Sequence, residues 1–390
     1  MRGGSQNFGW IIVGKTKKKV ESFFNNSIDY TLLITVLLLL AMGLIMVLSA
    51  SSPTALSEGR SSYAYFIRQA LFAGIGLVAM AIISKIDYRI YKRFYIVVYI
   101  LSIIFLAAVL VIGKKINGAR RWIYITESLS FQPSEIVKLF MIIFYATILT
   151  KNRDDLTNFW KGWIKHLAFL IPIIGLLVIE PHLSASIVII AICVIMMVLA
   201  GCKLWQIIVP GVAIGVPIFA IAIWKIEKFA HAMTRITTFI DPWQDKLGDG
   251  WQVIQSLYAI GSGGLFGLGL GQSKQKYLYL PEPQNDFIFS VLAEELGFVG
   301  CAFVIILFAI LIWRGILTAM KAPDMFGSLM AIGITALIGI QAIINITVVT
   351  SSMPATGMPL PFFSYGGTAL FILLCEIGVL LNISRAGNKN

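Results

Sequence analysis

Charged residues are scarce in this chain. Of its 390 residues, 31 are Lys or Arg and 19 are Asp or Glu, so that 13% are charged while 58% are hydrophobic. A soluble globular domain carries about 25% charged and about 45–50% apolar residues, because its surface faces water. The composition therefore excludes a soluble globular protein, a disordered chain and, despite a net charge of +12, a nucleic-acid-binding domain. It predicts a membrane protein with many spans.

Cysteine is also rare, and its placement excludes two further classes. The four cysteines lie in or beside apolar runs, and none forms a Cys-x-x-Cys pair. This spacing argues against a disulfide framework and against a thiolate metal site. No cluster of His, Asp or Glu has the spacing of metal ligands either, so the sequence predicts no metal site.

Long apolar runs, in contrast, cover most of the chain. A membrane-spanning helix needs about 20 mostly apolar residues. Ten such runs are present: 29–50, 67–84, 95–113, 133–150, 164–180, 183–201, 205–224, 287–313, 327–350 and 367–384. The predicted fold is all-α, a single ten-span membrane domain over 29–384 between a basic tail at 1–28 and a short tail at 385–390.

The basic residues predict that both termini are cytoplasmic. With the N-terminus inside, 18 of the 31 Lys and Arg fall in cytoplasmic segments and 11 fall outside, as the positive-inside rule favours. The outer residues are still unexpectedly numerous, and they gather at 114–121 and in the long connection 225–286. Basic residues in these positions predict an anionic ligand outside the membrane.

The connection 225–286 is an extracytoplasmic loop between the seventh and eighth spans. A loop of about 60 residues is far longer than usual and is either functional or disordered, and its many aromatic residues favour order. The segments 225–240 and 251–260 are amphipathic, as in helices that lie on a membrane surface. Six glycines between Gly261 and Gly271 allow the backbone to approach either another helix or a phosphate group closely.

Asp286 is the main candidate for chemistry, since it stands where this loop re-enters the membrane. A carboxylate at that depth is partly removed from water, which suits a general base. The alternative, compatible role is an N-cap of the next helix. Lys274 and Lys276 precede it as candidate ligands for an anion. Glu294 and Glu295 follow inside an apolar run, where acids are either functional or paired.

Two basic or ion-paired segments add further candidates on the outer side. Arg120 and Arg121 stand beside Trp122, and guanidinium groups suit bidentate phosphate binding, although interfacial anchoring is the alternative. Glu135 and Lys138 share one face of the fourth span, so that they form either a buried ion pair or a substrate contact.

Two outer turns complete the candidate site. Glu180 and His182 flank a proline between the fifth and sixth spans, and a histidine there either titrates near neutrality or is simply hydrogen-bonded. The segment 354–368 contains three prolines and three glycines. Irregular backbone at membrane depth is tolerated only where it lines a cavity or is covered by protein, so this segment, with Ser364 and Tyr365, is expected to form a wall of the site.

In combination these motifs resemble the SEDS family (shape, elongation, division and sporulation), whose branches include FtsW, RodA and SpoVE. The matching stretches are 118–123, 131–139, 249–271, 280–297 and 353–368. The segments 241–243 and 277–289 and the closing Pro-Leu-Pro-Phe-Phe-Ser-Tyr-Gly-Gly are closer to FtsW and SpoVE than to RodA.

The resemblance implies a bacterial glycosyltransferase of the cytoplasmic membrane that acts at the division septum. Such an enzyme polymerises lipid II, an undecaprenyl-pyrophosphate-linked disaccharide-pentapeptide, with a class B penicillin-binding transpeptidase and other divisome proteins as partners. The family's essential loop aspartate matches Asp286, and its acidic and basic residues at the start of the fourth span match Glu135 and Lys138. His182 departs from the family, many of whose members have an acidic residue there.

The implied reaction is a single inverting displacement at the anomeric carbon, by analogy with glycoside chemistry. Asp286 would act as the base, and cations would stabilise the departing pyrophosphate. The candidate cations are Arg120, Arg121, Lys138, Lys274 and Lys276, and a divalent cofactor, Mg²⁺ or Mn²⁺, would serve the same purpose. A lipid II flippase and a non-catalytic divisome scaffold remain alternatives, although no inverted repeat of broken spans, typical of many transporters, is evident.

Overall fold

The structure, a computed structural model, describes residues 28–116, 119–124, 130–203, 205, 239–245 and 249–388. Within these ranges, nine helices are long and apolar enough to cross a membrane. They are α2 (Tyr30–Ser57), α3 (Ala64–Ile83), α4 (Tyr95–Ile112, after a 3₁₀ turn at Tyr88–Phe94), α5 (Pro133–Lys151), α7 (Leu170–Ile179, after a π-helical turn at Phe159–Ile164 and the short α6, Lys165–Ala168), α8 (Leu183–Ala200), α12 (Ile288–Lys321), α13 (Met325–Val349) and α14 (Gly367–Gly387).

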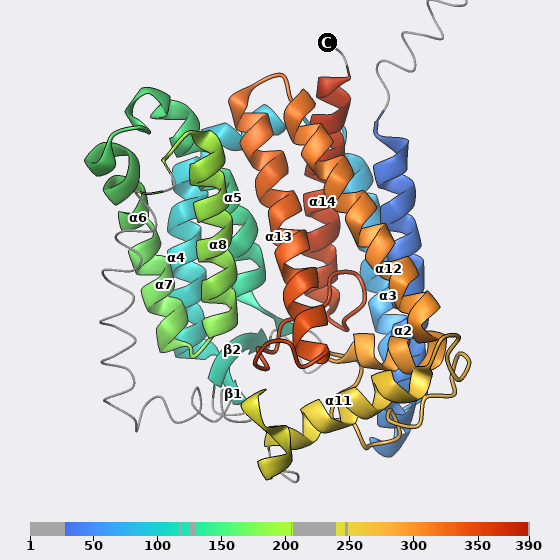
Figure 1. The fold of residues 1–390 in the computed structure, drawn as a ribbon. Helices are drawn as coiled ribbons and strands as arrows, with labels where there is room; N and C mark the ends of the chain where they lie inside the picture. Colours follow the sequence, from blue (N-terminus) through green and yellow to red (C-terminus); the bar gives the residue numbers. More distant parts are fainter. Residues whose placement is uncertain are drawn as a thin grey trace, which may run out of the picture.

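These helices confirm nine of the ten predicted spans, with ends that shift by up to eight residues. The remaining span, 205–224, lies outside the described residues apart from Trp205. In Figure 1, α2 begins and α14 ends at the top of the bundle, so both termini of the described chain leave from one end. Which end faces the cytoplasm stays a prediction.

The helices differ in how deeply they are buried. Most side chains of α5, α13 and α14 are buried, whereas fewer than a quarter of those on α3 and α4 are buried. Because α3 and α4 are almost entirely apolar, their exposed faces would contact lipid. The bundle therefore has a packed centre at α5, α13 and α14, where polar side chains can be kept away from lipid.

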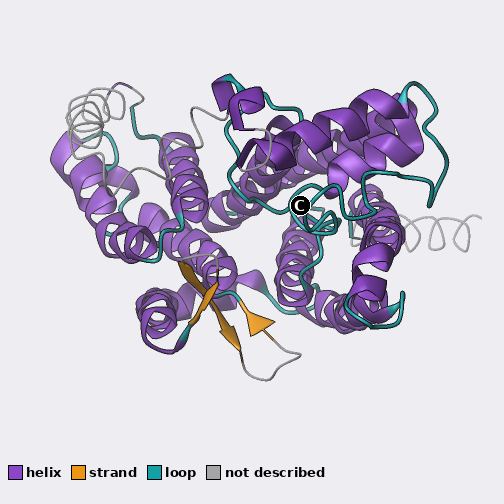
Figure 2. Cartoon of the chain, turned by 90° about the horizontal axis from the view of Figure 1, so that it is seen from below, coloured by secondary structure: helices purple, strands orange, loops and turns teal. Residues whose placement is uncertain are grey.

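The bottom end of the bundle carries the irregular structure. Helix α11 (Asp249–Gly263) lies across this end at a steep angle to the spans (Figure 1), as predicted for the amphipathic segment 251–260. A three-stranded antiparallel sheet, β1 (Lys114–Ile116), β2 (Ala119–Tyr124) and β3 (Ser130–Phe131), also lies here (Figure 2). The sheet was not predicted, and it corrects the all-α description in this one place.

The glycine-rich segment packs against a break in α12. Gly297 has φ 65° and ψ −167° inside this helix, and the peptide N–H groups of Leu268 and Gly269 donate to the carbonyls of Glu294 and Glu295, at 2.9 and 3.0 Å. A Cβ at Gly267 would lie 2.1 Å from the carbonyl oxygen of Glu295. Of the two predicted roles, the structure therefore shows close packing against a helix.

The two acids at this break are paired rather than free. The Nζ of Lys276 lies 2.7 Å from Oε1 of Glu295 and donates to Ser49 Oγ at 3.0 Å. Glu294 accepts the peptide N–H of Lys274 at 2.9 Å. Both acids are buried, so these contacts offset the cost of removing their charges from water and fix the start of the loop that ends at Asp286.

Candidate active site

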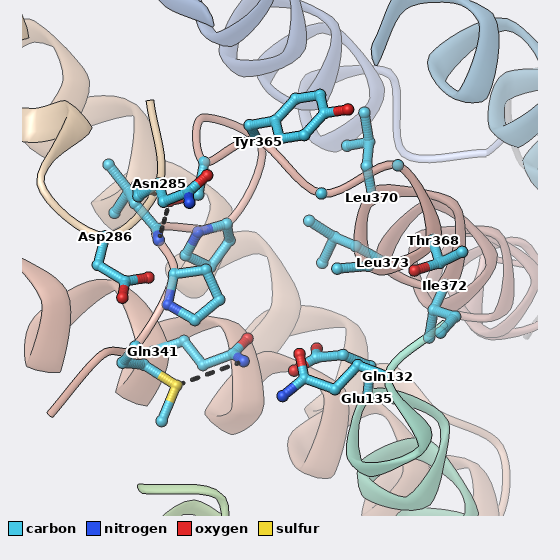
Figure 3. A pocket seen from close by; sticks show the side chains of 18 of the residues that line it. Gln132, Glu135, Asn285, Asp286, Gln341, Tyr365, Thr368, Leu370, Ile372 and Leu373 are labelled. Carbon is cyan, nitrogen blue, oxygen red and sulfur yellow. Dashed lines mark hydrogen bonds between the residues drawn. The ribbon is translucent and has the colours of Figure 1, made fainter. Parts of the chain in front are cut away.

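A cavity of about 490 Å³ opens at the bottom end of the bundle, between α3, the sheet, α5, the start of α8, α13, α14 and the two loops 264–287 and 350–366. Its volume lies within the range of about 300–1,000 Å³ that is typical of small-molecule sites. Seven of the eleven predicted site residues line it: Arg121, Glu135, Lys138, His182, Asp286, Ser364 and Tyr365. In Figure 3, Asp286 lies on one side of the cavity and Gln132 and Glu135 on the other, with Gln341 between them.

Asp286 is half-buried at the end of the long loop. Helix α12 begins after Phe287, which occupies the N-cap position without a side-chain bond, so the predicted N-cap role is not what the structure shows. The Nδ2 of Asn345 donates to the carbonyl oxygen of Asp286 at 2.7 Å. A Cβ at Gly357 would lie 3.3 Å from Asp286 Oδ2, so the last loop passes directly beside the carboxylate.

The last loop is held in place by Ser364 and by residues of α3. Ser364 Oγ donates to the carbonyl of Asn285 at 2.8 Å and accepts the N–H of Leu360 at 2.7 Å, which ties this loop to the residue before Asp286. Arg68 of α3 donates to the hydroxyl of Tyr365 at 3.3 Å. The predicted wall is therefore present, and Ser364 stabilises it in addition to lining the cavity.

Glu135 and Lys138 form an ion pair at the start of α5. Their side-chain atoms are 2.8 Å apart, and the side chains are 13% and 2% exposed. Pro133 occupies the first turn of the helix, where its missing N–H costs nothing. Since both residues also line the cavity, the two predicted roles, a buried pair and a substrate contact, are compatible in this geometry. Glu376 of α14 lies close enough to interact electrostatically with both.

Arg121 connects the sheet to the turn between α7 and α8 by donating to the carbonyl of Pro181. Burial raises the pKa of Glu180 to about 8, and the positive charge of Arg121 only partly opposes this. Burial, with the charges of Arg121 and Lys138, lowers the pKa of His182 to about 3. His182 is thus neutral at pH 7, and the alternative that it titrates near neutrality is not supported.

Four of the predicted residues do not line the cavity. Arg120 donates to the carbonyl of Leu110 at 2.7 Å, because neighbouring residues of a strand point to opposite faces. Glu180 is buried behind the turn, Lys274 is exposed elsewhere, and Lys276 is committed to Glu295. Sequence proximity to Asp286 was therefore a poor guide to proximity in space.

The cavity also contains charged and amide residues that were not predicted. They are Arg68, Gln132, Glu282, Asn285, Gln341 and Glu376. Arg68 and Glu376 lie inside predicted spans, and an ionisable residue there is expected to be functional, so this signal was available. Glu282 and the three amides have no comparable signal. Among the described residues, no group of three or more His, Cys, Asp or Glu could hold a metal ion.

The sequence matches one known protein family over nearly its whole length. The profile of the FtsW/RodA/SpoVE family of cell cycle proteins matches residues 30–389. Stage V sporulation protein E of Bacillus subtilis is 44% identical, over 92% of this chain and 97% of that protein. The probable peptidoglycan glycosyltransferase FtsW of Trichlorobacter lovleyi is 40% identical, over 93% of this chain and 94% of that protein.

Solved structures share the fold. One, described as structural coordination of polymerization and crosslinking by a peptidoglycan synthase complex, has a TM-score of 0.74 at 28% identity and covers 93% of this chain and 99% of that one. The rod shape determining protein RodA of Thermus thermophilus has a TM-score of 0.68 at 27% identity, covering 92% and 97%. Identity to the SpoVE and FtsW relatives exceeds identity to this RodA, as predicted. The chain belongs to the FtsW/RodA/SpoVE family of cell cycle proteins, the SEDS family.

Proposed function

We propose that this protein is a peptidoglycan glycosyltransferase that polymerises lipid II into glycan strands at the outer face of the bacterial cytoplasmic membrane. The observation that carries the proposal is the cavity that brings Asp286 together with Arg68, Arg121 and the Glu135–Lys138 pair. It lies at one end of the bundle, where a membrane-anchored substrate can present its headgroup. Relatives named as probable peptidoglycan glycosyltransferases support the same reaction.

The chemistry follows from these side chains. Asp286 accepts the proton of the acceptor sugar's 4-hydroxyl, whose oxygen forms a bond to the anomeric carbon of the donor. The bond from that carbon to the pyrophosphate oxygen breaks, so the α-linked donor becomes a β-linked polymer and undecaprenyl pyrophosphate leaves. Arg68, Arg121 and Lys138 line the cavity and supply positive charge for the leaving group. Arg120, Lys274 and Lys276 are left out because they do not line it.

A divalent cation, Mg²⁺ or Mn²⁺, remains a proposed cofactor of the reaction. Among the described residues, no group of three or more His, Cys, Asp or Glu could hold one, so such an ion would be held by one or two carboxylates of the cavity together with the pyrophosphate of the substrate. Loss of polymer formation on chelation, restored by added metal, would support its participation. An unchanged rate after chelation would remove it from the scheme.

The cellular setting is proposed from the relatives. We place the enzyme in the cytoplasmic membrane at the division septum, with a class B penicillin-binding transpeptidase and other divisome proteins as partners. A solved relative belongs to a complex that coordinates polymerization and crosslinking, which supports a transpeptidase partner. A sporulation protein is also among the relatives, so a role in the septum that forms during sporulation is an alternative cellular setting to test.

The test of the enzyme is polymerisation of labelled lipid II by the purified protein with its transpeptidase. Asp286→Asn keeps the shape of the side chain but removes the base, and we expect the rate to fall about 100-fold or more. The matched control is Asp241→Asn, which removes a carboxylate of the same long loop that does not line the cavity. A rate for Asp286→Asn close to that of the control would contradict the base assignment.

The same reconstitution separates the alternatives. A flippase would move lipid II across sealed vesicles without forming polymer, and a scaffold would do neither. The charged residues that line the cavity lie at one end of the bundle. This position favours the enzyme, since transporters hold their substrate near the bilayer midplane. Polymer made in detergent, where no bilayer has to be crossed, would exclude both alternatives.

A further inference from the structure

Asn345 links the two loops that meet at Asp286. It lies near the end of α13 and is 1% exposed, and it does not itself line the cavity. Its Nδ2 donates two hydrogen bonds, both at 2.7 Å, one to the carbonyl oxygen of Asp286 and one to that of Met358. A single amide nitrogen therefore uses both of its hydrogens to join segments that are far apart in sequence.

The second of these bonds also bears on the carboxylate. Met358 follows Gly357, the residue that passes beside Asp286 Oδ2. Gly357 has φ 67°, a conformation that only glycine adopts at little cost. The bond to Met358 holds this stretch of backbone in place, while the bond to Asp286 holds the aspartate's own peptide. Asn345 therefore bonds both the backbone of Asp286 and the backbone that passes beside its carboxylate.

We propose that Asn345 is a positioning residue that fixes the carboxylate of Asp286 in the cavity wall for the transfer reaction. The proposal rests on the proposed function, because it assigns Asn345 a role through Asp286. A side chain buried in a helix is a rigid support, and a misplacement of about 1 Å can cost about 100-fold in rate. Asn345 does not line the cavity and reaches it only through the backbones of Asp286 and Met358, so it acts on the rate by positioning the carboxylate.

The test uses full-length Asn345→Asp, which keeps the shape of the side chain but replaces the donating nitrogen by an oxygen. We expect kcat for lipid II polymerisation to fall at least 10-fold with KM unchanged. In Asn345→Ala, kcat should fall less, because water can enter the space and bridge the two carbonyls. In Asn345→Asp, the carboxylate faces the two carbonyls without a hydrogen to donate. A residue that acted only through packing would give the opposite order.

The matched control is Asn382→Asp in α14. Asn382 is also buried, and its Nδ2 donates to a backbone carbonyl, that of Ser84, at 2.8 Å, at the opposite end of the bundle from the cavity. It should lose stability in the same way but keep its kcat per folded molecule. A kcat for Asn345→Asp within twofold of the control would overturn the proposal.

Hydrogen exchange separates failure of this proposal from failure of the proposed function. In Asn345→Asp, amide exchange should rise at 284–287 and 356–360, and it should stay at the wild-type level there in Asn382→Asp. If exchange rises but Asp286→Asn still polymerises lipid II, the link is present and the base assignment is wrong. If Asp286→Asn is inactive and Asn345→Asp changes neither exchange nor kcat, the positioning role is wrong.

Discussion

At the scale of single residues, strain and unusual charge gather at one end of the molecule. Among the described residues, the five non-glycine positions with positive φ are Pro181, Leu278, Glu282, Ser351 and Phe362. All stand in the turns and loops around the cavity, and none lies inside a span. Such backbone costs about 1–3 kcal/mol per residue and persists where surrounding contacts enforce it, as Arg121 does by donating to the carbonyl of Pro181.

Glu180 gives a prediction about pH. Its pKa in the folded protein, about 8, exceeds its ordinary value of 4.5, so the folded state retains a proton that the unfolded chain has lost. Stability therefore falls as pH rises toward 8. His182 has the opposite effect, but only below about pH 6.5, its ordinary pKa. We expect the thermal unfolding temperature in detergent to fall between about pH 6.5 and 8, and Glu180→Gln to make this slope shallower.

The control for that prediction is Glu58→Gln, which changes an exposed acid that does not line the cavity. It should keep the slope of the wild-type protein. If Glu180→Gln kept the same slope as well, the buried carboxyl would not be the source of the pH dependence.

At the scale of elements, the contact between the glycine-rich segment and the break in α12 requires a glycine at one specific position. Gly267 has φ 77°, and an added Cβ would meet the backbone of Glu295 and Gly297. The break and the segment are therefore matched to each other, because the exposed backbone groups of one are bonded by the other. This pairing fixes the loop that leads to Asp286.

Gly267→Ala should destabilise the protein more than Gly271→Ala. Both positions have a left-handed backbone, with φ 77° and 80°, but an added Cβ at Gly271 meets nothing within 4 Å. The left-handed conformation costs each alanine about 1 kcal/mol, and the clash at Gly267 adds about 1–3 kcal/mol. Thermal unfolding of the two variants measures the difference. Equal unfolding temperatures would show that the segment does not pack against α12.

At the scale of the whole molecule, the orientation in the membrane is the testable consequence of the charge distribution. Glu58 follows α2 at the end that carries the cavity, and Lys85 follows α3 at the opposite end, and both are exposed. With both termini inside, Glu58→Cys should react with a membrane-impermeant maleimide in intact cells. Lys85→Cys should react only after the membrane is opened. The reverse pattern would place the cavity in the cytoplasm and rule out the proposed reaction.

The sequence by itself determined the spans and much of the site. Apolar runs predicted nine of the described helices because a bilayer demands about 20 apolar residues for each crossing. Charged residues at or near the span ends predicted Asp286, Arg121, Glu135 and Lys138 as candidates, and all four line one cavity. The small sheet was not predicted, because strands of three, six and two residues are too short to show a clear alternation of apolar and polar residues.

Only the tertiary structure decided which of the charged residues face one cavity. Lys276 and Asp286 are close in sequence, yet the first is paired with Glu295 while the second lines the site with residues of α3, α5 and the last loop. The side to which a loop residue turns depends on long-range contacts such as those of Asn345 and Ser364. These contacts join distant segments, and no local pattern of polarity specifies them.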